Sequence, residues 1–217
     1  MTFTYRYLDL PPLPQSIIDQ AYLSLEKKEK IGFYNTSLHD LPGHKEYRNR
    51  VVKFKDGKDV ESVESYRYWI SEEFDDWVKT YAQQDPRGCG INIFSGGTLV
   101  APHVDASRFY NIQYILETGG DNVETVWYRE KGKDVLRPDL KGNFNLKDTI
   151  DDYNRVEEID RVRFTVGKWV CINVGILHAV ENMQQSRVAI HLSRQTAPDH
   201  LKYTYSSTIE DGTVNGL

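Results

Sequence analysis

The stretch Phe109-Tyr-Asn-Ile-Gln-Tyr-Ile-Leu116 decides the fold class of this chain. Aromatic and β-branched residues dominate it, as is typical of a strand. Five further runs of the same kind follow Gly88: Ile91–Phe94, Val123–Arg129, Arg161–Val166, Trp169–Val174 and Val188–Ser193. Turn residues such as Gly119-Gly-Asp-Asn122 separate these runs, and no helical pattern lies between them. Many short strands without intervening helices predict an antiparallel sandwich or a jelly roll.

The first 87 residues have helical periodicity instead. Apolar residues recur on one face from Ile17 to Leu25, behind a capping box at Ser16–Asp19, and again from Ile70 to about Gln83. We expect these helices to pack on the back of the sheet. The predicted organisation is a single domain with an N-terminal helical or mixed region (1–87), a jelly-roll core (88–195) and a C-terminal tail (196–217).

The composition excludes several classes of protein. With 12% aromatic residues, the chain is too rich in core-forming side chains to be disordered. A net charge of −5 provides no basic field and argues against a nucleic-acid partner. No apolar run approaches the ~20 residues of a membrane span, and the N-terminus lacks a secretory pattern. Two cysteines are too few for a disulfide framework, so we expect a cytoplasmic protein.

The segment Lys131–Asp160 is long and polar, and it separates two predicted strands. Loops of this length are usually binding loops, lids or disordered segments. We expect it to be the most mobile internal part of the substrate-free protein and to determine which substrate is accepted. The alternative is a solvated loop with no catalytic role.

Three short signals in the β half indicate a metal site. In His103-Val-Asp105, an extended chain directs both side chains to the same face. His178 follows the predicted strand Trp169–Val174, and Arg187 opens the next predicted strand. Two histidines and one carboxylate form the metal-binding set of non-haem Fe(II) oxygenases. Each signal alone is common in surface pairs or structural histidines, and only their order and context make the combination specific.

Four segments of the β half carry a resemblance to a known family: Pro102-His-Val-Asp105, Gly167-Lys-Trp-Val-Cys-Ile-Asn173, His178-Ala-Val-Glu-Asn182 and Arg187-Val-Ala-Ile-His-Leu192. Together they resemble the Fe(II)/2-oxoglutarate-dependent dioxygenases. The most similar branch is that of the aspartyl/asparaginyl β-hydroxylases, and the resemblance covers residues 88–195. It implies a double-stranded β-helix (a cupin-like jelly roll) that uses Fe(II), 2-oxoglutarate and O₂. His103, Asp105 and His178 would bind the iron, and Arg187 would pair with the distal carboxylate of 2-oxoglutarate. Some members of that branch lack the metal carboxylate that Asp105 provides here.

Other polar residues are candidates for the pocket. Asn111 and Gln113 share one strand face, and alternation alone does not decide whether that face looks inward. We expect them to face the metal and cosubstrate, with a solvent-facing row as the alternative. His191 shares a face with Arg187 and is equally compatible with a core histidine. Arg108 is a candidate for binding an anionic substrate group, and Trp127 and Arg129 are candidates for the substrate mouth.

The resemblance implies hydroxylation of an amino acid, either free or within a peptide or protein. Two other classes stay open at this point. One is a metal-binding jelly-roll protein that is not an oxygenase, such as an isomerase or a sensor, which would have no need for Arg187. The other is a non-catalytic module that keeps a relic of the site.

Overall fold

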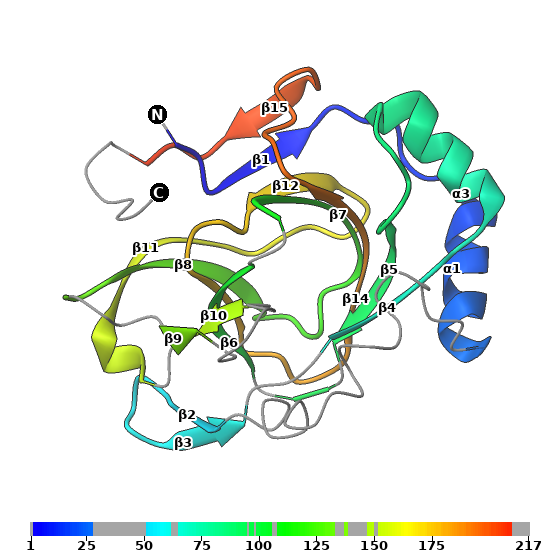
Figure 1. Ribbon diagram of the computed structural model, residues 1–217. Coiled ribbons are helices and arrows are strands. Elements are labelled where there is room, and N and C mark those ends of the chain that lie inside the picture. Colours follow the sequence, from blue (N-terminus) through cyan, green and yellow to red (C-terminus); the bar gives the residue numbers. More distant parts are fainter. Residues whose placement is uncertain are drawn as a thin grey trace.

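The computed structural model describes residues 2–27, 51–61, 65–94, 96–97, 99–105, 108–132, 137–138, 147–149 and 152–209. These residues form mainly antiparallel β-sheets with few helices (Figure 1). None of the helices in this part of the chain is long and apolar enough to cross a membrane.

Seven antiparallel strands form the larger sheet. In spatial order they are β15 (Tyr203–Ser206), β1 (Tyr5–Leu8), β12 (Trp169–Asn173), β7 (Tyr110–Glu117), β14 (Arg187–Arg194), β5 (Gly90–Phe94) and β4 (Ser65–Tyr68). Strands β1, β4 and β15 come from outside residues 88–195. The flanking regions are therefore part of the β framework, in addition to packing on it.

Six antiparallel strands form the smaller sheet. Their order is β11 (Val156–Val162), β8 (Glu124–Glu130), β13 (His178–Glu181), β6 (Leu99–Asp105), β10 (Lys147–Thr149) and β9 (Arg137–Pro138). A separate hairpin consists of β2 (Val51–Lys53) and β3 (Asp59–Glu61). The two large sheets face each other in Figure 1, which gives the fold of a β-sandwich or jelly-roll type.

The helices lie near the expected positions, with different ends. Helix α1 spans Gln15–Lys27, and Ser16 lies inside it, where its hydroxyl donates to Glu73 (2.7 Å). The predicted capping role of Ser16 is therefore wrong. The second helix is capped by Ser71 and consists of α3 (Glu72–Trp77) continued by the π-helical turn η2 (Val78–Ala82). A short 3₁₀ turn, η3 (Tyr153–Arg155), precedes β11.

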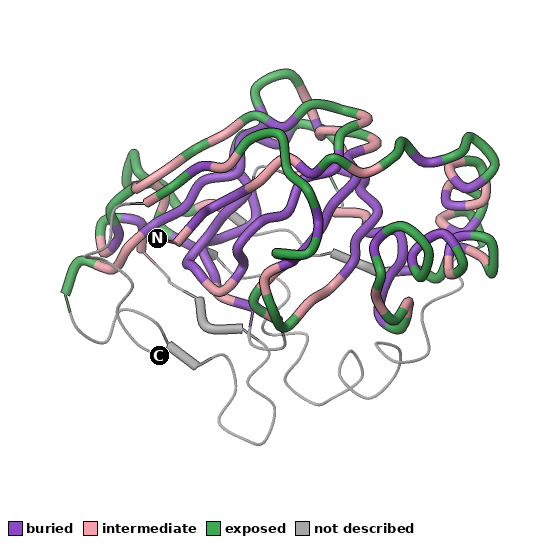
Figure 2. The backbone as a smooth tube through the Cα atoms, turned by 90° about the horizontal axis from the view of Figure 1, so that it is seen from above, coloured by how far each residue is buried: buried purple, intermediate pink, exposed green. Residues whose placement is uncertain are grey.

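The helices cover the outer face of the larger sheet. Ile17 from α1 and Phe74 from α3 belong to the same buried cluster as Ile112 from β7 and Ile190 from β14. Trp77 stacks on Trp169 of β12 with the ring centroids 4.9 Å apart. Figure 2 shows the buried residues running along the paired strands, whereas exposed residues gather on the helices and loops. This apolar packing is the main source of stability on that side.

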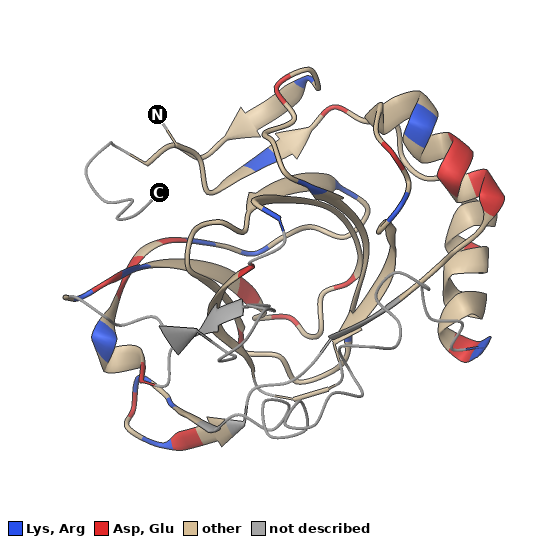
Figure 3. Cartoon of the chain, in the orientation of Figure 1, with Lys and Arg blue, Asp and Glu red and all other residues tan. Residues whose placement is uncertain are grey.

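The strand predicted at Arg161–Val166 is displaced. Strand β11 begins five residues earlier, at Val156, and ends at Val162. It pairs with β8 at the edge of the smaller sheet, and Figure 3 shows both acidic and basic residues along this edge. Arg161, for example, pairs with Glu158 and with Glu124. Charges on an edge strand discourage pairing with other chains. Because these residues are polar, the strand also lacks the apolar pattern by which strands are predicted from a sequence.

The expected mobile segment Lys131–Asp160 lies partly outside the described residues. Where the structure describes it, the segment contains β9, β10, η3 and the first part of β11. Residues 147–149 pair with β6, so that Lys147 lies opposite Asp105 and Thr149 lies opposite His103. The segment therefore returns to the sheet beside two of the candidate metal ligands.

Candidate metal centre

His103, Asp105 and His178 come together on neighbouring strands of the smaller sheet. His103 and Asp105 lie on β6, and His178 lies on β13 directly opposite His103. One ligand atom from each residue lies within 4.8 Å of the other two, and all three side chains are buried. Strand pairing thus assembles two imidazoles and one carboxylate into a group that could hold a metal ion.

Both imidazole rings are oriented by the backbone of their own strand. The Nδ1 atom of His103 lies 2.8 Å from the carbonyl oxygen of Ala101, and Nδ1 of His178 lies 2.9 Å from that of Ile176. Since a carbonyl oxygen only accepts, Nδ1 carries the hydrogen in both rings. This tautomer assigns metal binding to Nε2, as in many metal sites where the second ring nitrogen donates to the protein.

Asp105 is held by Arg108. The Nε–H of Arg108 donates to Oδ2 of Asp105 (2.7 Å), and Nη1 of Arg108 donates to the hydroxyl of Ser193 (2.8 Å). The other carboxylate oxygen, Oδ1, lies 3.4 Å from Nε2 of His103. Arg108, a candidate for binding an anionic substrate group, forms an ion pair with a candidate metal ligand.

A cavity lies between the two sheets at this site. The volume in it that a water-sized sphere can occupy is about 40 Å³. The three candidate ligands and Thr125 line it from the smaller sheet. Its lining from the larger sheet includes Asn92, Asn111, Gln113, Arg187 and His191. The structure therefore places Asn111, Gln113 and His191, which the sequence offered with an outward or core alternative, on the cavity side.

Arg187 is a buried cation that lines this cavity. Its side chain is 3% exposed, and burial lowers the pKa of its guanidinium to about 10, which leaves the group charged at neutral pH. Among the described residues, no carboxylate lies within ion-pair distance of it. The ring of Phe164 lies beside it, with the ring centroid 5.9 Å from Cζ. A buried, unpaired guanidinium is costly unless a ligand supplies the anion.

Several polar atoms in the cavity have no hydrogen-bond partner among the described residues. They are Oδ1 of Asn92, Oδ1 of Asn111 and Oγ1 of Thr125. Asn111 is oriented by its amide nitrogen, which lies 2.7 Å from Nδ1 of His191. Buried polar atoms without partners are rare in native proteins and indicate a place for a ligand or water. Sequence reasoning missed Asn92 and Thr125, although an amide within the apolar run Ile91–Phe94 was a signal.

Trp127 and Arg129 do not line this cavity. Trp127 is fully buried, and its indole N–H donates to the carbonyl oxygen of Asn173 (3.0 Å). Arg129 pairs with Glu157 on the adjacent strand. Trp127 belongs to the core and Arg129 to a partly exposed ion pair, and their place at the substrate mouth stays a prediction.

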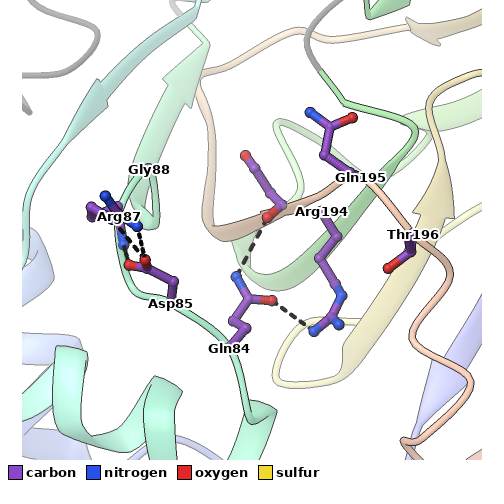
Figure 4. A pocket seen from close by; sticks show the side chains of 8 residues that line it. Gln84, Asp85, Arg87, Gly88, Arg194, Gln195 and Thr196 are labelled. Atoms are coloured by element: carbon purple, nitrogen blue, oxygen red, sulfur yellow. Dashed lines mark hydrogen bonds and ion pairs between the residues drawn. The ribbon is translucent and has the colours of Figure 1, made fainter.

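A second, more open pocket lies between residues 84–88 and the end of β14 (Figure 4). Gln84 accepts from Nη1 of Arg194 (3.0 Å) and donates to the backbone of Ser193, while Arg87 pairs with Asp85. These contacts connect the helix end to the sheet. None of the residues proposed from the sequence as metal or cosubstrate ligands lies there.

Comparison with known proteins adds little to this geometry. No family model matches the sequence, and no curated protein matches it. Among solved structures, the E. coli protein ycfD is similar to the chain, with 15% identity and a TM-score of 0.36. The alignment covers 88% of this chain and 55% of ycfD, so the chain spans about half the length of that protein.

Proposed function

We propose that the protein is an Fe(II)- and 2-oxoglutarate-dependent oxygenase. The observation that carries the proposal is the presence of two features in one cavity: the His103–Asp105–His178 group and the guanidinium of Arg187, which pairs with no carboxylate of the described residues. A site with only metal ligands would suit many metal proteins. A buried cation beside those ligands calls in addition for an anionic co-ligand, and 2-oxoglutarate supplies both a metal-chelating end and a distal carboxylate.

The strand order supports a double-stranded β-helix for the core. When the short strands β9 and β10 between β8 and β11 are left out, eight strands form the core in this chain order: β5, β6, β7, β8, β11, β12, β13 and β14. Counted in this order as one to eight, they lie as 1-8-3-6 in the larger sheet and 2-7-4-5 in the smaller sheet. Two interlocked Greek keys produce this interleaving, which is the arrangement of a jelly roll.

The protein residues would have separate roles. His103 and His178, through Nε2, and Asp105, through a carboxylate oxygen, would hold ferrous iron. Arg187 would bind the distal carboxylate of 2-oxoglutarate through a planar, permanently charged fork. When bound, the iron would supply the redox chemistry that couples decarboxylation of 2-oxoglutarate to oxidation of a substrate C–H bond by O₂.

The cavity walls would serve the same reaction. Both sheets enclose the ligands, which keeps bulk water away from the reacting groups. Asn111, Gln113 and His191 provide hydrogen-bonding groups for the cosubstrate or the substrate. The resemblance of the motifs favours a free or peptidyl amino acid as substrate, and the net charge of −5 does not favour a nucleic acid.

An anaerobic titration tests the proposal. Purified protein is mixed with Fe(II) and then with 2-oxoglutarate, and the visible absorption band of the iron chelate is followed. We expect a saturable band with the wild-type protein and none with His178→Ala. Succinate, which lacks the keto group, serves as the control and should give no band. Metal binding without any 2-oxoglutarate binding would overturn the oxygenase proposal in favour of a metal-binding protein of another class.

A further inference from the structure

We infer that Arg108 is a positioning residue that turns one oxygen of Asp105 toward the metal and holds the other oxygen away from it. The inference rests on the proposed function, because it assumes a metal ion between His103, Asp105 and His178. It assigns Arg108 a role in the metal centre instead of the substrate-binding role that the sequence suggested.

The two carboxylate oxygens of Asp105 have different surroundings. Oδ2 accepts from Nε of Arg108 at 2.7 Å, whereas Oδ1 lies 3.4 Å from Nε2 of His103. The side chains of Arg108 and Asp105 are 15% and 6% exposed. A charge-assisted hydrogen bond in such a protected place is stronger than one on the surface. Oδ1 is therefore the oxygen that belongs to the metal-binding group.

Arg108 is itself fixed by the opposite sheet. Its Nη1 donates to the hydroxyl of Ser193 on β14, which belongs to the larger sheet, while Asp105 lies at the end of β6 in the smaller sheet. The guanidinium therefore bridges the two sheets at the metal site. A planar group with several fixed donors can serve both partners at once, and a lysine ammonium on a flexible stem fits this geometry less well.

The bridge has a chemical consequence for the metal. A carboxylate that chelates through both oxygens would occupy an additional coordination position. With Oδ2 engaged by Arg108, Asp105 binds through a single oxygen, and that position stays open for the cosubstrate. Outer contacts of this kind typically change metal affinity by 10–100-fold when they are removed.

Co(II) binding to the ligand-free, full-length protein tests the inference without requiring turnover. Affinity is measured by titration, and the intensity of the visible d–d bands reports the coordination number. For Arg108→Met we expect about 10–100-fold weaker binding and weaker d–d bands, because the released carboxylate can chelate. Arg108→Lys should recover part of the affinity. Ser193→Ala should lose less, roughly 3–10-fold, because it removes one hydrogen bond of Arg108 and leaves the contact of Arg108 with Asp105 in place.

Arg87→Met is the matched control, since Arg87 is an exposed arginine that pairs only with Asp85 among the described residues (Figure 4). It should leave Co(II) affinity and the spectrum unchanged. Wild-type affinity and an unaltered spectrum in Arg108→Met would overturn the inference. If Arg108→Met does not fold, unchanged binding in Arg108→Lys and Ser193→Ala would overturn it equally. Failure of the wild-type protein to bind Co(II) would instead refute the metal centre itself, and with it the proposed function.

Discussion

Strand β14 has two faces of opposite character. Val188, Ile190 and Leu192 point to the outer side, where they are buried in the apolar cluster beneath the helices. Arg187 and His191 point to the inner side and line the cavity between the sheets. Both sets are almost fully buried, so burial alone does not separate them. The two sets differ in their surroundings: the outer side chains pack against other apolar groups, whereas the inner side chains are polar and face a cavity.

Strand β7 repeats the pattern beside it. Ile112 and Tyr114 belong to the outer apolar cluster, whereas Asn111 and Gln113 line the cavity. The outer face gains free energy from removing apolar surface from water. On the inner face, the free-energy cost of burying polar groups offsets part of that gain. Substitutions on the outer face should therefore lower mainly the stability of the protein. Substitutions on the inner face of the same strand should lower mainly ligand binding.

The largest effect is expected from the metal ligands of the inner side. His178→Ala should remove measurable binding of Fe(II) or Co(II), because two of the three protein ligands do not complete the group. The midpoint of thermal unfolding of the metal-free protein should change little. Metal titration and calorimetry measure the two quantities. Wild-type metal affinity in both His178→Ala and His103→Ala would remove the basis for treating the inner face as a metal site.

Arg187→Ala should weaken 2-oxoglutarate binding by roughly 2–5 kcal/mol, because a buried carboxylate would lose its charged partner. Metal affinity should be retained. Arg187→Lys should recover only part of the binding, since a point charge replaces a planar fork. Isothermal titration of the metal-loaded protein with 2-oxoglutarate measures both variants. Equal affinity in wild type and Arg187→Ala would show that the unpaired cation does not serve the cosubstrate.

Ile190→Ala tests the outer face of the same strand. It should lower the free energy of unfolding by about 2–5 kcal/mol, the cost of a cavity in a packed core. The more conservative Ile190→Val should cost roughly 0.5–1.5 kcal/mol. Metal and 2-oxoglutarate affinity of the folded protein should be unchanged. Denaturant unfolding together with ligand titration checks the pair, and a loss of affinity without a loss of stability would contradict the division between the faces.

Gly119→Ala should give the smallest effect, about 1–3 kcal/mol of stability. Gly119 has a φ of +90°, and a Cβ atom there would lie 3.0 Å from the carbonyl oxygen of Gln185 and 3.2 Å from Cβ of Arg187. Gly57→Ala is the control, because Gly57 also has a positive φ (+80°) but nothing within 4 Å. Only Gly119→Ala should also weaken 2-oxoglutarate binding. Equal effects of both variants would mean that backbone strain alone, and not contact with Arg187, is responsible.

The sequence predicted the central strands well because their apolar runs are long and bounded by turns. It misplaced β11, since Glu157, Glu158 and Arg161 make this edge strand look like a loop. His178 follows strand β12, as predicted, but the sequence did not show that it also opens the short strand β13. Four residues are too few to show a period.

His103 and Asp105 could be grouped from the sequence, because His-x-Asp spacing in an extended chain directs both side chains to one face. His178 joined them only through the order and context of the three signals. The role of Arg108 could not be read in the same way. Its two partners, Asp105 and Ser193, lie on different sheets, and the second contact depends on how the sheets face each other. Asn92 and Thr125 were missed for the same reason: they lie on different sheets, and they come together only because both line the same cavity.

The pairing of His103 with His178 across β6 and β13 has a consequence for folding kinetics. Each ring is oriented locally, yet the two rings meet only after two segments far apart in the chain have become neighbouring strands. Such long-range pairing is slow to form, because a long loop must close first. A metal ion can then bind the native state but not the earlier, partly ordered chain. Metal should therefore slow unfolding much more than it accelerates refolding.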